Sequence, residues 1–298
     1  MVTILNKKEQ DLMRESGKFI AKILKESKKY VQDSFDNNRS VNLLEIDDFV
    51  KDIIENQKGA ESCYVNYDPD FGDGPFAHYI CTSVNDAVLH GKPYDYQLQP
   101  DDLLSLDFAC SLNGLVTDSA ISFICADTDL SRHKLTETEY EPITGVLLET
   151  DTQLRKNKLP SINSQLEADL FLIDLTERAL AAGIKEAKPG NHIGDISAAI
   201  GDVIKDSGIP INLDFGGHGV GHTMHEDPHI PNDGERGTGV KLEPGMAIAI
   251  EPWLLMTTDE IAWDEDGWTI VSEDYSRGAH SEHSVLITDG DPEILTLW

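Results

Sequence analysis

Two aspartates lie inside apolar stretches of the chain, where an isolated charge is costly. Asp107 occurs in LLSLDFACSL and Asp118 in LVTDSAISFI, and both stretches have the composition of buried strands. An unpaired buried carboxylate is strongly destabilising unless it becomes protonated or gains a partner. Either aspartate alone could instead face water on an edge strand, but the two together indicate a bound cation.

The spacing of these aspartates allows one shared cation. The Asn-Gly pair at 113–114 is typical of a two-residue hairpin turn. With that turn, Asp118 lies opposite Ala109, and Asp107 is its diagonal neighbour on the same face. A four-residue loop would set the carboxylates directly opposite each other. A three-residue loop would place them on opposite faces and exclude the shared site.

Two glutamates repeat this pattern near the end of the chain. Glu251 ends the apolar run AIAIE, and Glu282 precedes the run SVLIT two residues later. Four carboxylates suit hard or borderline divalent ions, and one added imidazole favours a transition metal. Because this is too much ligand and negative charge for one catalytic ion, the composition favours two ions that share bridging oxygens.

The segment GGHGVGHTMHEDPHI, residues 216–230, holds four of the ten histidines. His218 has glycine on both sides, and glycine permits both positive φ and close approach of the backbone. We therefore expect His218 to supply the imidazole ligand. His225 could reach the same pocket as a hydrogen-bond donor to substrate, whereas His222 and His229 are expected at the rim or on the surface.

Apolar periodicity predicts the elements that must position these residues. Helices are expected over 8–31, after the cap residue Asn42, over 166–187 and over 194–208, where Gly208 ends the last of them. Short strand-like stretches and turns alternate between the helices, and His90 lies where one such stretch enters a loop. This organisation predicts an α+β or mixed α/β architecture in a single catalytic domain, 1–298, with a polar surface insertion at 127–164.

Composition excludes several classes of partner. The chain has 54 acidic against 24 basic residues, a formal charge of -30, which opposes direct nucleic-acid or membrane binding. The four cysteines are far apart, no apolar run approaches a membrane span, and the N-terminus lacks the pattern of a cleaved leader. We therefore expect a cytoplasmic protein. The acidic excess alone indicates no partner, because it also promotes solubility.

Five motifs carry a resemblance to a known family. ICTSVNDAVLHG, LDFACSLNGLVTDSA, GGHGVGHTMHEDP, AIAIEP and SEHSVLIT occur in the order and spacing of the methionine aminopeptidases, M24 metallopeptidases of the pita-bread fold. The match spans about residues 8 to 290. The short distance from His225 to Glu251 and the lack of a zinc-finger extension resemble type I. The resemblance implies two curved antiparallel sheets flanked by helices around a dinuclear metal site.

The resemblance also assigns metal ligands. It implies that Asp118 and Glu282 bridge two divalent ions (Co, Mn, Fe or Zn), that Asp107 completes one ion, and that His218 and Glu251 complete the other. A hydroxide that bridges the ions would attack the first peptide carbonyl, because the metals lower its pKa. Glu251 would also accept a proton, and the free amine of the substrate would reach the ion held by Asp107.

Substrate contacts follow from the same resemblance. His225 would stabilise the oxyanion and His90 would contact the amide nitrogen beyond the scissile bond, while Cys81, Met224 and Trp268 would line the methionine pocket. The implied activity removes the initiator methionine from nascent proteins with a small second residue. The implied partners are nascent N-termini and, transiently, the ribosome, and the implied state is a monomer.

The chain departs from the family pattern at a few positions. Thr117 precedes the second aspartate where glycine is common, Ser281 precedes the last glutamate where tyrosine is common, and Met224 replaces a common aromatic residue. The loop after Cys63 and Tyr64, which could join the pocket, is longer than usual. None of these departures removes a ligand.

Three other interpretations compete with this one. A prolidase or Xaa-Pro aminopeptidase would share the five ligands but carries a further domain before the first aspartate, whereas only 106 residues precede Asp107. A non-catalytic protein of the same fold would have lost ligands, and all five are present. A generic acidic domain would not explain why four carboxylates and one imidazole adjoin apolar strands.

Overall fold

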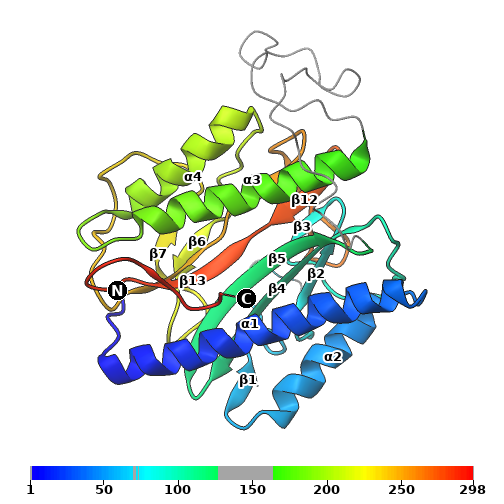
Figure 1. The fold of residues 1–298 in the computed structure, drawn as a ribbon, viewed down its shortest axis with the longest axis horizontal. Coiled ribbons are helices and arrows are strands. Elements are labelled where there is room, and N and C mark those ends of the chain that lie inside the picture. Colours follow the sequence, from blue (N-terminus) through cyan, green and yellow to red (C-terminus); the bar gives the residue numbers. More distant parts are fainter. Residues whose placement is uncertain (1, 70–71, 73, 127–163, 298) are drawn as a thin grey trace.

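Two pairs of helices lie over one face of a long antiparallel sheet (Figure 1). α1 (Lys7–Asp36) and α2 (Leu43–Asn56) cover one half, and α3 (Gln165–Glu186) and α4 (Ile193–Ser207) cover the other. This computed structural model describes residues 2–69, 72, 74–126 and 164–297. The insertion expected at 127–164 lies outside the described residues, except for its last residue.

The helices begin and end where local sequence signals indicated. The Asn42 side chain accepts a hydrogen bond from the backbone N–H of Leu44, and the Glu45 carboxylate accepts one from Asn42 in return. Gly208 ends α4 in the left-handed region, with φ of 79°. These caps satisfy backbone groups that a helix end leaves unpaired. The observed bounds confirm the four predicted helices to within a few residues, except that α1 extends further at its C-terminal end.

Strands from both halves of the chain join in one nine-stranded sheet. Its order is β1-β4-β5-β13-β8-β6-β7, with β2 beside β4 and β14 beside β13. A three-stranded sheet, β10-β11-β3, and a two-stranded sheet, β12-β9, complete the described part, and every pairing between these strands is antiparallel. The bounds are β1 (Ala60–Ser62), β2 (Cys81–Val84), β3 (Ala87–Leu89), β4 (Leu103–Leu112), β5 (Leu115–Ile124), β6 (Gly217–Gly219), β7 (Glu226–Ile230), β8 (Ala247–Ile250), β9 (Trp253–Leu255), β10 (Ile261–Trp263), β11 (Ile270–Ser272), β12 (Gly278–His280), β13 (Glu282–Leu286) and β14 (Glu293–Ile294).

The hairpin of β4 and β5 has the predicted register. Leu112 pairs with Leu115 across a two-residue turn whose residues 113–114 both have positive φ. Asp118 therefore pairs with Ala109, as expected, and Asp107 lies diagonally from Asp118 on the same face. The alternative three-residue loop is excluded.

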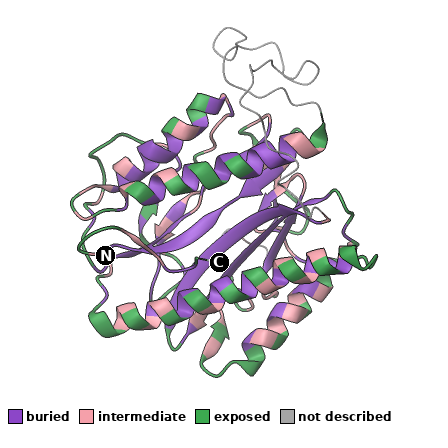
Figure 2. Ribbon diagram, in the orientation of Figure 1, coloured by how far each residue is buried: buried purple, intermediate pink, exposed green. Residues whose placement is uncertain are grey.

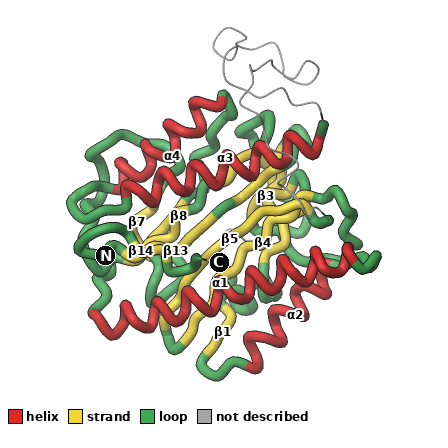
Figure 3. Tube along the Cα trace, in the orientation of Figure 1, coloured by secondary structure: helices red, strands yellow, loops and turns green. Residues whose placement is uncertain are grey.

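Burial on both faces of these strands explains why they are so apolar. Alternate residues of β4 and β5, such as Leu106 and Phe108, pack with α1 and α2 in one core cluster. The opposite face carries Asp107 and Asp118 and is also buried (Figure 2). The strands lie behind the helices (Figure 3), and none of the described helices is long and apolar enough to cross a membrane.

Serine hydroxyls reinforce the seam where the two halves of the sheet meet. β5 and β13 share only two residue pairs in the register, centred on Ser119 and Ala120. On one side, the Ser284 hydroxyl accepts a hydrogen bond from Asp118 N–H and donates one to Asp118 C=O, both of 2.8 Å. On the other side, the Ser122 hydroxyl bridges the N–H and C=O of His280 in the same way, at 2.9 and 2.8 Å. Each hydroxyl takes the place of a direct backbone hydrogen bond between neighbouring strands, so the backbone N–H and C=O groups beside the seam remain paired.

The glycines of β6 allow close packing rather than a special backbone conformation. Gly217 and Gly219 do not have positive φ. Of the two reasons expected for glycine around His218, positive φ is therefore wrong for these two residues, and close approach of the backbone is correct. A Cβ atom at Gly217 would collide with the carbonyl oxygen of Ala249, and one at Gly219 with that of Asp227. β6 therefore lies between two neighbouring backbones that leave no room for a side chain.

Replacing a β6 glycine should destabilise the fold. We expect Gly217→Ala to lower the free energy of unfolding by roughly 1–3 kcal/mol, because the added methyl must displace the β8 backbone. Gly221→Ala is the matched control, since its methyl would lie 3.5 Å from the nearest atom, an ordinary contact. Denaturant unfolding of both variants tests this, and an equal loss of stability in the two would contradict it.

Candidate metal centre and active site

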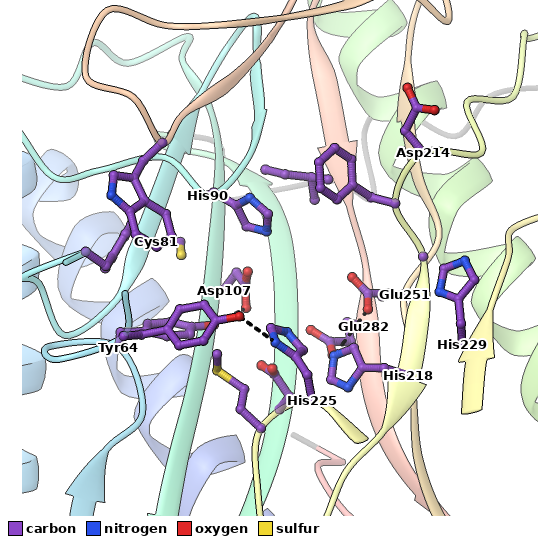
Figure 4. Close-up of a pocket in the computed structure, with 18 residues that line it drawn as sticks. Tyr64, Cys81, His90, Asp107, Asp214, His218, His225, His229, Glu251 and Glu282 are labelled. Carbon is purple, nitrogen blue, oxygen red and sulfur yellow. Dashed lines mark hydrogen bonds and ion pairs between the residues drawn. The ribbon is translucent and has the colours of Figure 1, made fainter. Parts of the chain in front are cut away.

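All five expected metal ligands line one cavity of about 290 Å³ (Figure 4). They come from five different strand segments: Asp107 from β4, Asp118 from β5, His218 from β6, Glu251 directly after β8, and Glu282 at the start of β13. The cavity lies on the sheet face opposite the α1 and α2 core, because the two aspartates alternate with residues of that core.

Strand register explains how distant residues meet. Asp107 and Glu282 both pair with Ala120, so they flank it from the two neighbouring strands on one face of the sheet. Asp118 is two residues before Ala120 on the same strand and therefore shares that face. His218 pairs with Ala249 of β8, and Glu251 follows two residues later. The seam of the sheet is thus the centre of the site.

Two buried carboxylate oxygens at this centre lack hydrogen-bond partners among the described residues. They are Oδ1 of Asp118 and Oε1 of Glu282, in side chains that are 4% and 2% exposed. Asp118, His218 and Glu282 each offer a ligand atom, and these atoms lie within 4.8 Å of one another. Buried oxygens without donors, beside an imidazole, fit a divalent metal ion.

Burial, reinforced by crowded negative charge, raises the pKa of the carboxyl groups in the cavity. Burial raises the pKa of Asp107 to about 6 and that of Glu251 to about 8, and the charge of Asp107 also raises the latter. Burial and the neighbouring carboxylates raise the pKa of Asp118 and Glu282 well above their ordinary values. Among the described residues, no lysine or arginine lines the cavity. A bound cation would let all four carboxylates ionise.

His218 is prepared to act as a ligand. Its Nδ1 lies 2.9 Å from the carbonyl oxygen of Gly219, a contact that assigns the ring proton to Nδ1 and leaves the Nε2 lone pair available. Nε2 is 3.4 Å from Oε1 of Glu251, and the side chain is 12% exposed. Burial lowers the pKa of His218 to about 3, so the imidazole is neutral, which is the form that binds metals.

The other predicted histidines lie at the wall and rim of the cavity. The His225 ring packs edge-on against His218, 4.5 Å between centroids, and its Nδ1 is 3.0 Å from the hydroxyl of Tyr67. His229 also lines the cavity wall. His222 is exposed, and its Nε2 is 3.7 Å from Oε1 of Glu9, so it lies outside the site.

His90 forms part of the opposite wall. It follows β3 with a positive φ of 54°, an uncommon conformation for a residue other than glycine. Its ring is 5.5 Å from that of Phe215, edge-on. Burial lowers the pKa of His90 to about 4, so it too is neutral near pH 7.

An apolar lobe of the cavity contains the three residues expected to hold a methionine side chain. Cys81 on β2 pairs with Asp107, and Met224 and Trp268 are 7% and 2% exposed. Tyr64 also lines the cavity, and its hydroxyl donates a 3.0 Å hydrogen bond to Oδ1 of Asp107. Cys63, by contrast, is not among the residues that line the cavity.

Two aromatic members of this lobe, Tyr67 and Phe76, were not predicted from the sequence. The Phe76 ring packs edge-on against Trp268 at 5.2 Å, and Tyr67 lies 6.1 Å from the same ring. Both come from the loop YVNYDPDFGDGPF, where aromatic residues among prolines and glycines were the available signal. The loop turns back so that the N–H of Phe76 donates to the carbonyl of Tyr67.

Hydroxyl pairs account for two of the departures from the family pattern, Thr117 and Ser281. The Thr117 hydroxyl is 3.0 Å from that of Ser16 on α1, and the Ser281 hydroxyl is 3.0 Å from that of Thr176 on α3. Thus the residue before each of the carboxylates expected to bridge two ions is tied to the helix that covers its own half. All four hydroxyl residues are buried, and each satisfies the other member of its pair.

Comparisons with known proteins agree with this geometry. The model of metallopeptidase family M24 matches residues 11–141 and 163–289. A methionine aminopeptidase of Mycoplasma capricolum is 33% identical, over 99% of this chain and 98% of its own. The crystal structure of a methionine aminopeptidase from Thermotoga maritima superposes with a TM-score of 0.79 at 31% identity, over 99% of both chains.

More distant structures share the fold alone. A prolidase from Pyrococcus horikoshii has a TM-score of 0.64 at 15% identity, over 98% of this chain and 63% of its own. The M24 relatives confirm the expected pita-bread fold with curved antiparallel strands. The two sheets that were expected are joined, because β5 and β13 pair and unite them in one nine-stranded sheet.

Metal binding should offset the loss of stability that the buried carboxyl groups cause as the pH rises. In the metal-free protein, Asp107 and Glu251 titrate with folded pKa values of about 6 and 8, above the ordinary values of 3.8 and 4.5. The folded chain therefore binds protons that the unfolded chain releases. The contribution of these two carboxyl groups to the free energy of unfolding is greatest below about pH 4 and is lost as the pH rises through about 6 to 8. Above about pH 6.5 the buried histidines, whose pKa values are lowered, are neutral in the folded and unfolded chain alike and do not oppose this fall.

Thermal unfolding after chelation, at several pH values between about 6.5 and 8.5, tests this dependence. We expect the Tm of the metal-free protein to fall with rising pH, and Mn²⁺ to raise Tm more at about pH 8.5 than at about pH 6.5, because metal displaces protons. Glu251→Gln is the control, and it should flatten the upper part of the fall. A metal effect on Tm that is the same at both pH values would contradict the prediction.

Proposed function

We propose a mechanism for this site from one premise: the chain belongs to metallopeptidase family M24. It is a metal-dependent exopeptidase that removes methionine from the N-terminus of polypeptides, as its methionine aminopeptidase relatives do. The observation that carries the mechanism is the pair of buried oxygens of Asp118 and Glu282, which have no hydrogen-bond partner and face a neutral imidazole.

The donor set supports two divalent ions, Co, Mn, Fe or Zn. Asp118 and Glu282 would contact both ions, Asp107 would complete one, and His218 with Glu251 would complete the other. When bound, such ions would polarise the peptide carbonyl and lower the pKa of water toward neutrality. The oxygens and one imidazole of this set accommodate any of the four metals.

Glu251 is placed to move a proton. Its carboxylate is buried beside His218, and its pKa is raised to about 8 by burial and by the charge of Asp107. Such a carboxyl is protonated in the metal-free site, and a bound cation that ionises it would leave a buried carboxylate able to take up a proton. We infer that Glu251 accepts a proton from the attacking water and delivers it to the departing amine.

The two wall histidines would act on the reacting peptide bond. The Nδ1 of His225 is engaged by Tyr67, which leaves its Nε2 for the substrate, and we infer that this atom stabilises the oxyanion. His90 would contact the amide nitrogen beyond the scissile bond. Both roles rest on positions in the wall of the cavity that also holds the carboxylate cluster (Figure 4).

The apolar lobe suits a methionine side chain. Cys81, Met224 and Trp268 are polarisable or aromatic and buried, and thioethers pack favourably against aromatic edges. We infer that this lobe takes the first residue of the substrate. The second residue would lie toward His90 and Phe215, whose packed rings favour a small side chain there.

We infer a cellular setting from the charge of the chain. The substrates would be nascent polypeptides in the cytoplasm, met near the ribosome by transient encounter. A net charge of -30 opposes direct contact with ribosomal RNA but attracts the protonated amino terminus of a substrate. One complete set of ligands within one chain is consistent with a monomer.

Substitutions should separate metal binding from transition-state stabilisation. His218→Ala and Glu282→Ala should weaken metal affinity at least about 100-fold, since even outer-shell partners contribute 10–100-fold. His225→Ala should lower kcat by roughly 100–1000-fold with metal retained, as loss of an oxyanion donor does. His222→Ala is the control, because this histidine is exposed outside the site. Loss of bound metal in His225→Ala would contradict the assignment.

Peptide cleavage tests the substrate. After metal is stripped and single divalent ions are restored, methionine should be released from Met-Ala-Ser with a kcat/KM at least about tenfold higher than from Met-Lys-Ser. The physical reason is the limited space for the second side chain. Equal cleavage of the two peptides, or release of a residue only from X-Pro peptides, would refute the proposed specificity.

A further inference from the structure

A buried histidine that has no role in the mechanism above lies directly behind the site. His280 is 1% exposed, and neither of its ring nitrogens has a hydrogen-bond partner among the described residues. A buried polar group without a partner is destabilising, and an apolar side chain would serve the core better. The position of His280 therefore requires an explanation.

The nearest charged group to this imidazole is Glu251. The Nε2 of His280 is 3.8 Å from Oε2 of Glu251, while Oε1 of the same carboxylate is 3.4 Å from Nε2 of His218. The two oxygens of Glu251 thus face two different imidazoles. The Nε2 of His218 carries a free lone pair and therefore cannot donate a hydrogen bond to Oε1 of Glu251. Oε2 of Glu251, which faces His280, is the oxygen that can accept a hydrogen bond from an imidazole N–H.

The backbone of His280 is fixed more firmly than its side chain. Ser122 bridges its N–H and C=O across the seam, and His280 pairs with Trp253 in the two-stranded sheet. His280 precedes Glu282 by two residues, so the sequence itself places both side chains toward one face. A ring carried on this anchored backbone can hold Glu251 in one orientation.

We propose that His280 is a positioning residue: once Oε1 of Glu251 is engaged at the reacting centre, the Nε2–H of His280 closes the 3.8 Å separation, donates a hydrogen bond to Oε2 and fixes the plane of that carboxylate. The proposal rests on the proposed role of Glu251 as ligand and proton acceptor. His280 would thereby set the orientation of the Glu251 carboxylate, since a carboxylate held at one oxygen cannot rotate away from the reacting centre. His280 itself does not contact substrate.

Two substitutions of equal length test the hydrogen bond. His280→Gln keeps an N–H donor at the end of an unbranched side chain, and His280→Met removes it while filling a similar volume. His280→Asn and His280→Leu form a second pair that differs in the same way, for use if the first pair does not fold. The measurements are the visible absorption of the Co²⁺-loaded protein, the Co²⁺ stoichiometry, and kcat and KM on Met-Ala-Ser.

We expect His280→Met to lower kcat about 10- to 100-fold, with KM within about threefold and stoichiometry unchanged, and to alter the Co²⁺ absorption as Glu251 moves. His280→Gln should restore kcat to within about fivefold of the wild type. His283→Leu is the control for losing a buried histidine: this ring contacts Thr296 at 3.0 Å, and we expect Tm to fall while kcat and the spectrum persist.

Wild-type kcat and absorption in His280→Met would overturn the proposal, and so would equal impairment of the Gln and Met variants. Failure of the underlying function is separable, because it would be seen in the wild-type protein as no Co²⁺ uptake or no release of methionine. In that case all variants would match the wild type. A defect confined to the donor-free variants belongs to His280 alone.

Discussion

Four buried carboxylates line one cavity together with the exposed Asp214, and among the described residues no lysine or arginine joins them; this is the constraint on which the rest of the structure depends. Burial raises the pKa of all four, and repulsion from neighbouring carboxylates adds to the shift for Asp118, Glu251 and Glu282. Divalent ions relieve this repulsion and satisfy the orphaned oxygens of Asp118 and Glu282. The proposed chemistry follows, because the same ions would polarise the substrate carbonyl.

The sheet is built so that its seam and its site coincide. Asp107 and Glu282 flank Ala120 at the place where β5 and β13 pair, and serine hydroxyls close the seam on both sides. Each half of the chain contributes a carboxylate from a strand that its own helix holds through a hydroxyl pair. The ligands are therefore carried by regular strands, which position side chains more accurately than loops do.

The part of the site that depends on local sequence could be predicted. The Asn-Gly turn fixes the β4–β5 register, and the register alone sets Asp107 and Asp118 on one face. The glycines around His218 indicated close approach, but only the structure shows that neighbouring backbones, not positive φ, require them. The association of these segments with Glu251 and Glu282 was suggested by the shared pattern of carboxylates beside apolar runs, and the family resemblance supported it. No local rule brings together residues more than a hundred positions apart.

Contacts between residues far apart in the chain could not be predicted from the sequence. Tyr67 meets His225, 158 residues away, through a loop whose path no periodicity defines. His280 could have been noticed from its spacing to Glu282, but its proximity to Glu251 depends on the fold of β8 and β12. These residues share a property: they orient the groups that do chemistry, and orientation is set by tertiary structure.

The central claim is that the carboxylate cluster at the seam binds two metal ions. Anomalous diffraction from crystals of the Mn²⁺-loaded protein, collected near the manganese edge, tests it most directly. We expect two anomalous peaks in the cavity, both in contact with Asp118 and Glu282, with His218 at one peak and Asp107 at the other. Anomalous peaks only at acidic surface residues, or none at all under saturating Mn²⁺, would contradict it.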